Sequence, residues 1–289
     1  MKKVIEISNL SKKYGDLVAI DDISFEVYQG EIFALLGANG AGKTTTLECI
    51  EGLRKYDNGQ ITTDGSIGVQ LQSSSLPNNM TVNETFTLHS KWNKREVDIL
   101  LFNRFGLDKL KSKKYGVMST GEKRRLHLAL ALINNPDIII LDEPTAGLDV
   151  EGRVSLHDEI RKLKEEGKTI VIASHDMAEV ESLCDRIAIL KNGSFAFLGT
   201  AGELTNNYMK NIDIHIKVSK SMDHSSFVNC EYKCVYQEYL VFQTKKIDEA
   251  LLELLGYLKE SNNEVLDLII ERPSLEDKFI EIARGGNVE

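Results

Sequence analysis

The stretch Gly37-Ala38-Asn39-Gly40-Ala41-Gly42-Lys43-Thr44 decides the fold of this 289-residue chain. It fits the pattern G-x4-G-K-[ST], in which glycines let the backbone curl so that its N–H groups face phosphate oxygens. The apolar run 31–36 comes directly before it, and a helix is expected to begin near residue 43. A helix N-terminus adds a partial positive charge at the same place. The stretch therefore predicts a nucleotide site between a strand and a helix.

Around this loop, strand-like segments alternate with helical ones. The continuous apolar runs 138–141 and 169–173 are typical of parallel strands buried on both faces. Between them, residues 154–165 carry apolar side chains near helical spacing. Segments 4–7 and 23–27 alternate with period two, as half-buried strands do. The pattern predicts an α/β domain with a parallel sheet over residues 1–210.

The polar stretch 200–207 ends this alternation, and residues 211–289 are expected to form a small α+β accessory domain. The expected elements are strands at 212–218, at 228–243 (one strand or a hairpin) and at 265–271, with helices at 247–260 and 274–284.

Composition excludes several classes of protein. Hydrophobic residues make up 42% and charged residues 27%, so the chain is neither disordered nor a disulfide scaffold. Its net charge of −9 is opposite in sign to that of most proteins that wrap duplex DNA. Four scattered cysteines fit a reducing cytosol. No apolar run approaches the ~18 residues of a membrane span, and the start of the chain is not a signal peptide, so membrane contact is expected through a partner.

Two adjacent acids follow the apolar run 138–141. A carboxylate at the end of a buried strand is costly unless it meets a cation, so Asp142 is the expected Mg²⁺ partner beside the Thr44 hydroxyl. Lys43 is expected to reach the β and γ phosphates. Glu143 is then placed to orient or deprotonate an attacking water molecule.

Several further motifs, in order along residues 3–205, resemble those of the ATP-binding subunit of an ABC transporter. They are the signature-like Ser119-Thr120-Gly121-Glu122-Lys123, the D-loop-like Ala146-Gly147-Leu148-Asp149, His175 after the strand 169–173, Gln72, and Tyr14 before Gly15. The resemblance implies a P-loop NTPase (ABC ATPase) fold with a helical subdomain at about 76–135, and ATP and Mg²⁺ as ligands.

The same resemblance implies a role for each position. Glu143, His175 and Lys43 would be catalytic, and Tyr14 would stack on adenine. ATP would be bound by Tyr14, Gly37, Ala38, Asn39, Gly40, Ala41, Gly42, Lys43, Thr44, Thr45 and Gln72, and Mg²⁺ by Thr44, Gln72 and Asp142. The signature residues Ser119, Thr120, Gly121 and Glu122 would contact the ATP of a partner subunit, and Asp149 would lie in the D-loop.

Some of these assignments have alternatives. Gln70 competes with Gln72 for the Q-loop role, because both lie on the same side of a strand. The run 123–125 is basic, but a solvated first helical turn fits the acidic chain better than a nucleic-acid patch. Cys230 and Cys234 are too few for a zinc site and are expected to be half-buried thiols. The signature departs from the usual L-S-G-G-Q at three positions, namely Met118, Thr120 and Glu122.

One copy of each motif implies a second ATPase subunit, with a homodimer as the expected form. The resemblance also implies a separate integral membrane permease, docked on the Q-loop region and the segment 76–106, and a cytoplasmic location at the inner face of the membrane. The aromatic residues Trp92, Phe102 and Phe105 in that segment are expected to be core residues. The stretch 273–281 resembles the closing motif of bacterial export ATPases, which favours an exporter over a soluble ATPase acting on ribosomes or nucleic acid.

Overall fold

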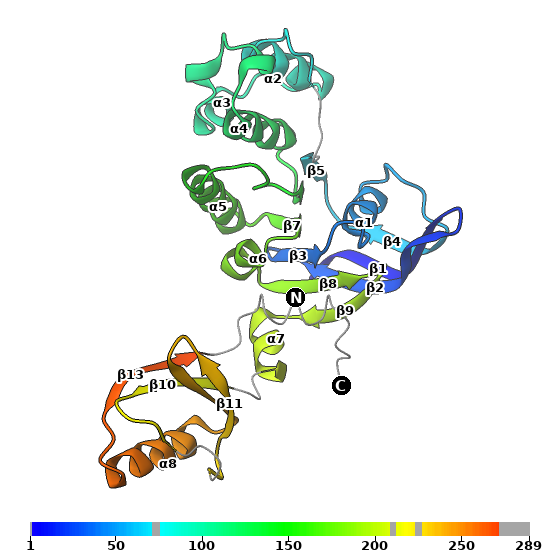
Figure 1. Ribbon diagram of the computed structural model, residues 1–289. Helices are drawn as coiled ribbons and strands as arrows, with labels where there is room; N and C mark the ends of the chain where they lie inside the picture. The colour runs from blue at the N-terminus through cyan, green and yellow to red at the C-terminus, as the bar shows by residue number, and fades with distance from the viewer. Residues whose placement is uncertain (1, 71–75, 209–211, 223–226, 272–289) are drawn as a thin grey trace. The chain divides into compact units, whose positions relative to one another are not determined.

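The computed structural model describes residues 2–70, 76–208, 212–222 and 227–271 (Figure 1). Two compact units divide near residue 200, as Met1–Gly199 and Thr200–Asn287. Gln72, the stretch 273–281 and the expected helix at 274–284 lie outside the described residues. None of the described helices has the length and apolar composition that crossing a membrane requires.

A six-stranded sheet forms the centre of the first unit. Its order is β5 (Ile67–Gln70), β6 (Ile138–Asp142), β7 (Thr169–Ser174), β3 (Ile32–Gly37), β8 (Arg186–Lys191) and β9 (Ser194–Gly199). The first five strands run parallel, and only the edge strand β9 is antiparallel to its neighbour. The predicted parallel α/β sheet is confirmed, and the carboxyl ends of its strands meet at one edge.

Each central strand sends alternate side chains to two cores. In β6, Ile138 and Ile140 pack in one core, whereas Ile139 and Leu141 pack in the other. The first core holds α1 (Lys43–Ile50) and an antiparallel sheet of β2 (Leu17–Tyr28), β1 (Lys3–Tyr14) and β4 (Asn58–Thr63). The second holds the helices, among them α5 (Val150–Glu165) and α6 (Met177–Leu183). Figure 1 shows α1 and α5 on opposite sides of the central strands.

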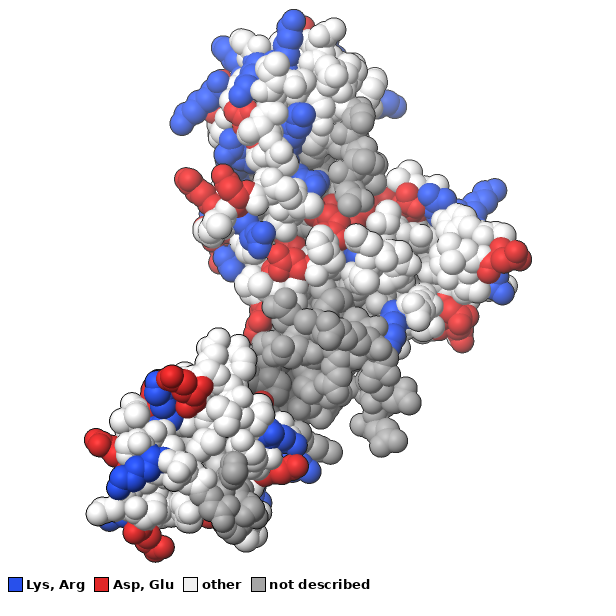
Figure 2. Space-filling model, in the orientation of Figure 1, with Lys and Arg blue, Asp and Glu red and all other residues white. Residues whose placement is uncertain are grey.

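The segment after β5 is helical. It contains α2 (Val82–Trp92), α3 (Ile99–Arg104), the 3₁₀ turns η1 (Asp108–Leu110) and η2 (Tyr115–Val117), and α4 (Thr120–Ala131). Phe102 and Phe105 are buried, as predicted, but Trp92 is 68% exposed, so its prediction as a core residue is wrong. Trp92 ends α2 and contacts only the His89 ring among described aromatic partners, at 5.2 Å between centroids. Figure 2 shows that Lys and Arg side chains gather over this segment.

The second unit confirms the elements predicted between residues 212 and 271. Its antiparallel sheet has the order β11 (Glu231–Tyr236), β12 (Tyr239–Thr244), β10 (Ile212–Val218) and β13 (Val265–Glu271). The segment predicted as one strand or a hairpin is the β11–β12 hairpin. Helix α8 (Ile247–Glu260) packs on this sheet, and their shared core is Ile214, Ile216, Cys230, Phe242, Ala250, Leu254 and Leu258.

The polar stretch after residue 199 is a helix, α7 (Ala201–Tyr208), rather than a break in regular structure. The Thr200 hydroxyl accepts the Glu203 N–H at 3.0 Å, and the Glu203 carboxylate accepts the Thr200 N–H at 2.7 Å. This reciprocal pair is a capping box, which starts a helix in spite of a polar sequence. The spacing of Thr200 and Glu203 predicts the start of a helix, although the polar composition of the stretch does not.

Candidate nucleotide-binding site

The predicted phosphate loop leaves the fully buried strand β3 and enters α1 at Lys43. Gly42, directly before the helix, has φ +109°, and a Cβ there would lie 2.5 Å from the carbonyl oxygen of Ala19. A side chain is therefore excluded by both the backbone conformation and the contact. Ala41 anchors the loop from the other side, because its carbonyl accepts the Gly193 N–H at 3.2 Å. The loop is held in shape by packing that involves β2 and the β8–β9 turn.

Lys43 is folded into this loop. Its Nζ donates to the carbonyls of Gly37 at 2.7 Å and Ala38 at 3.3 Å, and lies 3.6 Å from Glu143 Oε1. The side chain is only 6% exposed, so its charge is held where the loop would surround phosphate groups. An ammonium with three donors can exchange such carbonyl partners for phosphate oxygens without leaving the loop.

Thr44 and Asp142 meet across the edge of the sheet. The Thr44 hydroxyl donates to Asp142 Oδ2 at 3.0 Å, although the two residues are 98 positions apart. Asp142 Oδ1 is buried and has no hydrogen-bond partner in the part of the chain that the structure describes. Burial raises the pKa of Asp142, with the neighbouring Glu143 charge adding to the effect, while Thr44 and Lys43 oppose it. Buried carboxylates in proteins are paired with a cation or coordinate a metal ion, so this oxygen is a candidate ligand.

This pair fits Mg²⁺. The ion prefers hard oxygen ligands and takes one or two protein ligands together with phosphate oxygens and water. A threonine hydroxyl and an unpaired carboxylate oxygen supply such ligands next to the phosphate loop. The described residues form no cluster of three His, Cys, Asp or Glu side chains that would hold a metal ion without a nucleotide.

Glu143 and His175 are bonded to each other. His175 Nδ1 lies 2.6 Å from Glu143 Oε2, and an ionised carboxylate only accepts hydrogen bonds, so Nδ1 carries the proton. Glu143 is buried, whereas the His175 side chain is 56% exposed. Glu143 has φ +49°, a conformation that non-glycine residues seldom adopt, and its N–H donates to the Ala173 carbonyl of β7 at 2.9 Å. The strained backbone turns this carboxylate towards the loop.

A pocket of about 420 Å³ opens beside these groups. It is lined by Tyr14, Leu17, Val18, Ala19, Asn39, Gly40, Gly42, Lys43, Thr44, Thr45 and Glu143. Its volume is that of a small-molecule or cofactor site, about 300–1,000 Å³. Tyr14 ends β1, is 39% exposed, and has Lys12 and Arg54 within 5.5 and 5.3 Å of its ring centroid. The structure thus brings an accessible aromatic ring and the phosphate loop to one pocket.

The predicted signature residues lie at the start of α4 and do not line this pocket. Ser119 is the N-cap, and it forms a capping box with Glu122, whose carboxylate accepts the Ser119 N–H at 2.8 Å. Met118 is buried, so the Leu-to-Met departure keeps an apolar contact. Ser119 and Thr120 are exposed at the positive end of the helix, which favours a nearby anion.

Asp149, the predicted D-loop residue, caps α5 by accepting the Gly152 N–H at 2.8 Å. One turn later, Arg153 donates to Asp176 at 2.9 Å. Asp176 follows His175 in the chain and caps α6. The helix that follows the D-loop is therefore tied by an ion pair to the loop that carries His175. Nothing in the local sequence around Arg153 signals this link.

The residue before His175 is held as well. The Ser174 hydroxyl donates to Glu179 Oε2 at 2.6 Å and accepts the Asp176 N–H at 3.0 Å. Glu179 has a fully buried side chain, and its second oxygen lies 3.7 Å from His157 Nε2 of α5. Sequence reasoning missed Ser174, Glu179 and His157 because they act through contacts with other helices.

The structure describes only one of the two candidates for the Q-loop glutamine, Gln70. Gln72 lies outside the described residues, so its assignment stays a prediction. Gln70 ends β5 and is 1% exposed, and its amide nitrogen and oxygen have no hydrogen-bond partner among the described residues. Its backbone pairs with Leu141, directly before Asp142. The chain therefore keeps an unpaired amide close to the carboxyl edge of the sheet.

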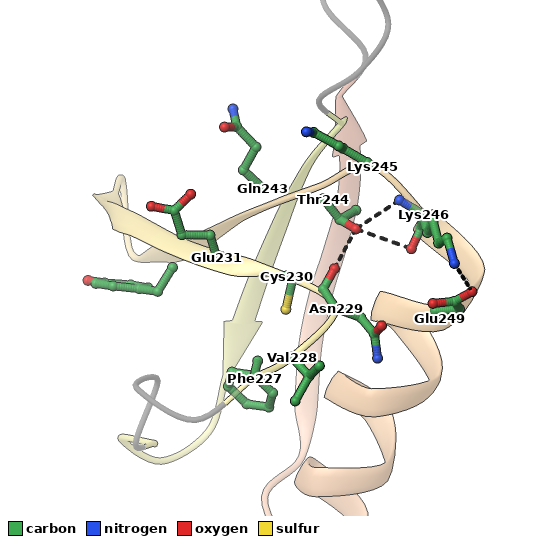
Figure 3. Close-up of a pocket in the computed structure, with 11 residues that line it drawn as sticks. Phe227, Val228, Asn229, Cys230, Glu231, Gln243, Thr244, Lys245, Lys246 and Glu249 are labelled. Carbon is green, nitrogen blue, oxygen red and sulfur yellow. Dashed lines mark hydrogen bonds and ion pairs between the residues drawn. The ribbon is translucent and has the colours of Figure 1, made fainter.

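A second pocket, of about 710 Å³, lies in the second unit, between the start of β11 and the start of α8. Figure 3 shows the Thr244 hydroxyl bonded to the carbonyls of Asn229 and Lys246, and the Lys246 ammonium bonded to Glu249. Burial raises the pKa of Cys230 to about 11, so its thiol stays protonated and unreactive. Cys230 is buried and Cys234 exposed, so neither is the half-buried thiol that was predicted. The polar groups Asn229, Thr244, Lys246 and Glu249 bind one another.

The fold and the site define a phosphate-loop nucleotide-binding protein. Residues 20–146 match the family model described as ABC transporter. The linearmycin resistance ATP-binding protein LnrL of Bacillus subtilis is 30% identical over 96% of this chain and 98% of its own length. The Nod factor export ATP-binding protein I of Rhizobium johnstonii is 33% identical over 96% of this chain and 94% of its own length.

Solved structures give the same result. One described as an ATP-binding subunit of an ABC transporter is 28% identical, with a TM-score of 0.63 over 71% of this chain and 93% of its own. With near full-length relatives at 30% identity or more, the chain belongs to the family of ABC transporter ATP-binding proteins. Members of this family are ATPases that drive transport, which confirms the fold and the enzyme class expected from the sequence.

Proposed function

We propose that this chain hydrolyses ATP as the motor subunit of an exporter, paired with a second copy and docked on a separate membrane permease. The observation that carries the proposal is the bonded pair Glu143–His175 beside Lys43, at a loop that also places Thr44 against Asp142. Glu143 contacts both His175 and Lys43, and Asp142, the residue before Glu143, contacts Thr44.

In the proposed mechanism, the loop N–H groups and Lys43 hold the phosphates, and Tyr14 contacts the adenine ring. Mg²⁺, held by Thr44 and Asp142 with Gln72 as a further ligand, would neutralise the charge that develops on the phosphate oxygens. Glu143 orients the attacking water and accepts its proton. His175 donates to Glu143 through Nδ1 and so holds the carboxylate in place. Positioning and charge supply most of the catalysis.

A second subunit completes the site in this proposal. The signature residues Ser119, Thr120, Gly121 and Glu122 do not line the pocket of their own chain, so we assign them to the nucleotide of the partner. A homodimer is the expected form, because one chain carries both halves of a site. Residues 1–210 would be the ATPase domain, with its helical subdomain at 76–135, and residues 211–289 the accessory domain.

The direction of transport rests on the relatives. Two relatives that align over 96% of this chain are named for linearmycin resistance and Nod factor export. We therefore propose export, with the chain located in the cytoplasm at the inner face of the membrane through the permease. The sequence stretch 273–281, which resembles the closing motif of export ATPases, supports the same direction.

The experiment is affinity purification of the tagged chain from native membranes in mild detergent, with the untagged chain as control. We expect a protein with several membrane spans to copurify in stoichiometric amount. Copurification of ribosomal or nucleic-acid-bound proteins without a membrane protein would overturn the transporter proposal and leave the ATPase assignment standing.

A further inference from the structure

Glu122 has an ion-pair partner that its helix does not supply. Its carboxylate already accepts the Ser119 N–H at 2.8 Å within the capping box of α4. In addition, Lys113 Nζ donates to both carboxylate oxygens, at 2.8 and 2.7 Å. The two side chains are 36% and 16% exposed, so the pair lies at the surface beside the signature residues and is only partly shielded by protein.

The main chain of Lys113 has a separate task. Its carbonyl accepts the Val82 N–H at 3.0 Å, and its N–H donates to Leu110 at 2.8 Å, which fixes the start of α2. Lys111 makes the same kind of backbone contact, accepting the Asn83 N–H at 3.0 Å, but its side chain has no ion pair among the described residues. The backbone contacts in this segment therefore do not require a lysine side chain to form an ion pair. The ion pair of Lys113 with Glu122 must have a different role.

Electrostatics gives that reason. Burial alone would raise the pKa of Glu122, but the Lys113 ammonium and the Ser119 N–H outweigh it, so the pKa lies below its ordinary value and the carboxylate is charged at neutral pH. Where the chain has Glu122, the signature pattern that it resembles has an uncharged glutamine. If the start of α4 contacts a nucleoside triphosphate, an unpaired Glu122 carboxylate would repel the phosphate groups.

We propose that Lys113 is a positioning residue of the signature loop. By binding both oxygens of Glu122, it cancels the extra negative charge and holds the capping carboxylate away from the incoming phosphates. A loop with glutamate can then close on the nucleotide of a second subunit as a loop with glutamine would. This inference rests on the proposed function, because it assigns the start of α4 to a partner's nucleotide.

The test compares four full-length proteins: the wild type, Lys113→Met, the double variant Lys113→Met with Glu122→Gln, and Lys111→Met as the matched control. Methionine keeps the aliphatic length of lysine and removes the charge. The readouts are ATP-dependent dimerisation by sedimentation, binding of a fluorescent ATP analogue to the monomer, and the rate of phosphate release at low and high salt.

We expect Lys113→Met to weaken ATP-dependent dimerisation and to lower kcat/KM for ATP, each about tenfold, because like charges then face each other at a surface of high effective dielectric. Binding of the analogue to the monomer stays within about twofold. Salt at about 1 M, where the Debye length is ~3 Å, should reduce the difference in dimerisation between Lys113→Met and the wild type. The double variant regains dimerisation, because the charge that required neutralisation has been removed. Lys111→Met behaves as the wild type.

Two results would overturn the inference by itself. One is a double variant as impaired as Lys113→Met, which would mean that the lysine acts through packing of the helical segment. The other is normal dimerisation of Lys113→Met. A wild-type chain that does not pair with ATP would overturn the proposed function and this inference with it, so the two failures are distinguishable.

Discussion

Replacing Glu143 by glutamine is the sharpest test of the proposed chemistry. Glutamine has nearly the same size, and its side-chain oxygen can still accept the hydrogen bond that His175 Nδ1 makes at 2.6 Å. What the variant loses is the carboxylate that would accept a proton from water. The charge facing Lys43 at 3.6 Å is lost as well. The substitution therefore separates the geometry of the site from its basicity.

The expected size of the effect follows from these contacts. A positioned general base contributes about 10²–10⁴-fold, so kcat should fall by at least about 10²-fold, or roughly 2.7 kcal/mol in the barrier. Nucleotide binding should not weaken, because Glu143 is among the groups that raise the pKa of the adjacent Asp142, and its removal leaves Asp142 easier to ionise. The ATP-bound dimer should accumulate, since closure continues while hydrolysis stops.

Phosphate release at saturating ATP and sedimentation with ATP and Mg²⁺ measure these quantities. Wild-type protein with ADP is the control for pairing. Turnover within about threefold of the wild type would remove Glu143 from the role of base. A loss of nucleotide binding together with turnover would show instead that the carboxylate holds the loop together.

Two more predictions concern the loop and the core. Gly42→Ala should abolish nucleotide binding and cost about 1–3 kcal/mol of stability, because the new Cβ would lie 2.5 Å from the Ala19 carbonyl oxygen and φ is +109°. The control is Gly256→Ala on α8, where a Cβ has open space and the substitution should be neutral or stabilising. Wild-type nucleotide affinity in Gly42→Ala would refute the packing argument. Burial, helped by the Arg124 charge, lowers the pKa of His127 to about 4 from an ordinary 6.5. The unfolded chain therefore takes up a proton below pH 6.5 that the folded chain refuses until about pH 4, and this group should remove about 1.4 kcal/mol of stability per pH unit in that window. Urea unfolding of His127→Gln between pH 7 and 4.5 should show a shallower loss than the wild type, and parallel profiles would contradict the prediction.

Elements whose signal lies in a few neighbouring residues could be predicted from the sequence. The strand 212–218, the helix 247–260 and the strand 265–271 match the structure at both ends, because period-two and helical spacing of apolar residues survive without knowledge of the rest of the chain. The helix α7 was missed because a polar composition hid its capping box. The prediction that Trp92 is a core residue was wrong. Neighbouring residues in the chain do not determine whether an aromatic side chain at a helix end is buried.

The phosphate loop, the Asp142–Glu143 pair and the ordered motifs were determined by the sequence alone, since each is a short run whose chemistry depends on residue type and spacing. The tertiary structure alone decided which of these groups touch. It pairs Thr44 with Asp142, His175 with Glu143, and Lys113 with Glu122. For the first two pairs the physical reason is that parallel strands bring distant residues to one edge of the sheet; the third forms where the chain between α3 and α4 folds back on the start of α4. The Asp142 oxygen that has no partner among the described residues is buried only when the edge of the sheet is assembled.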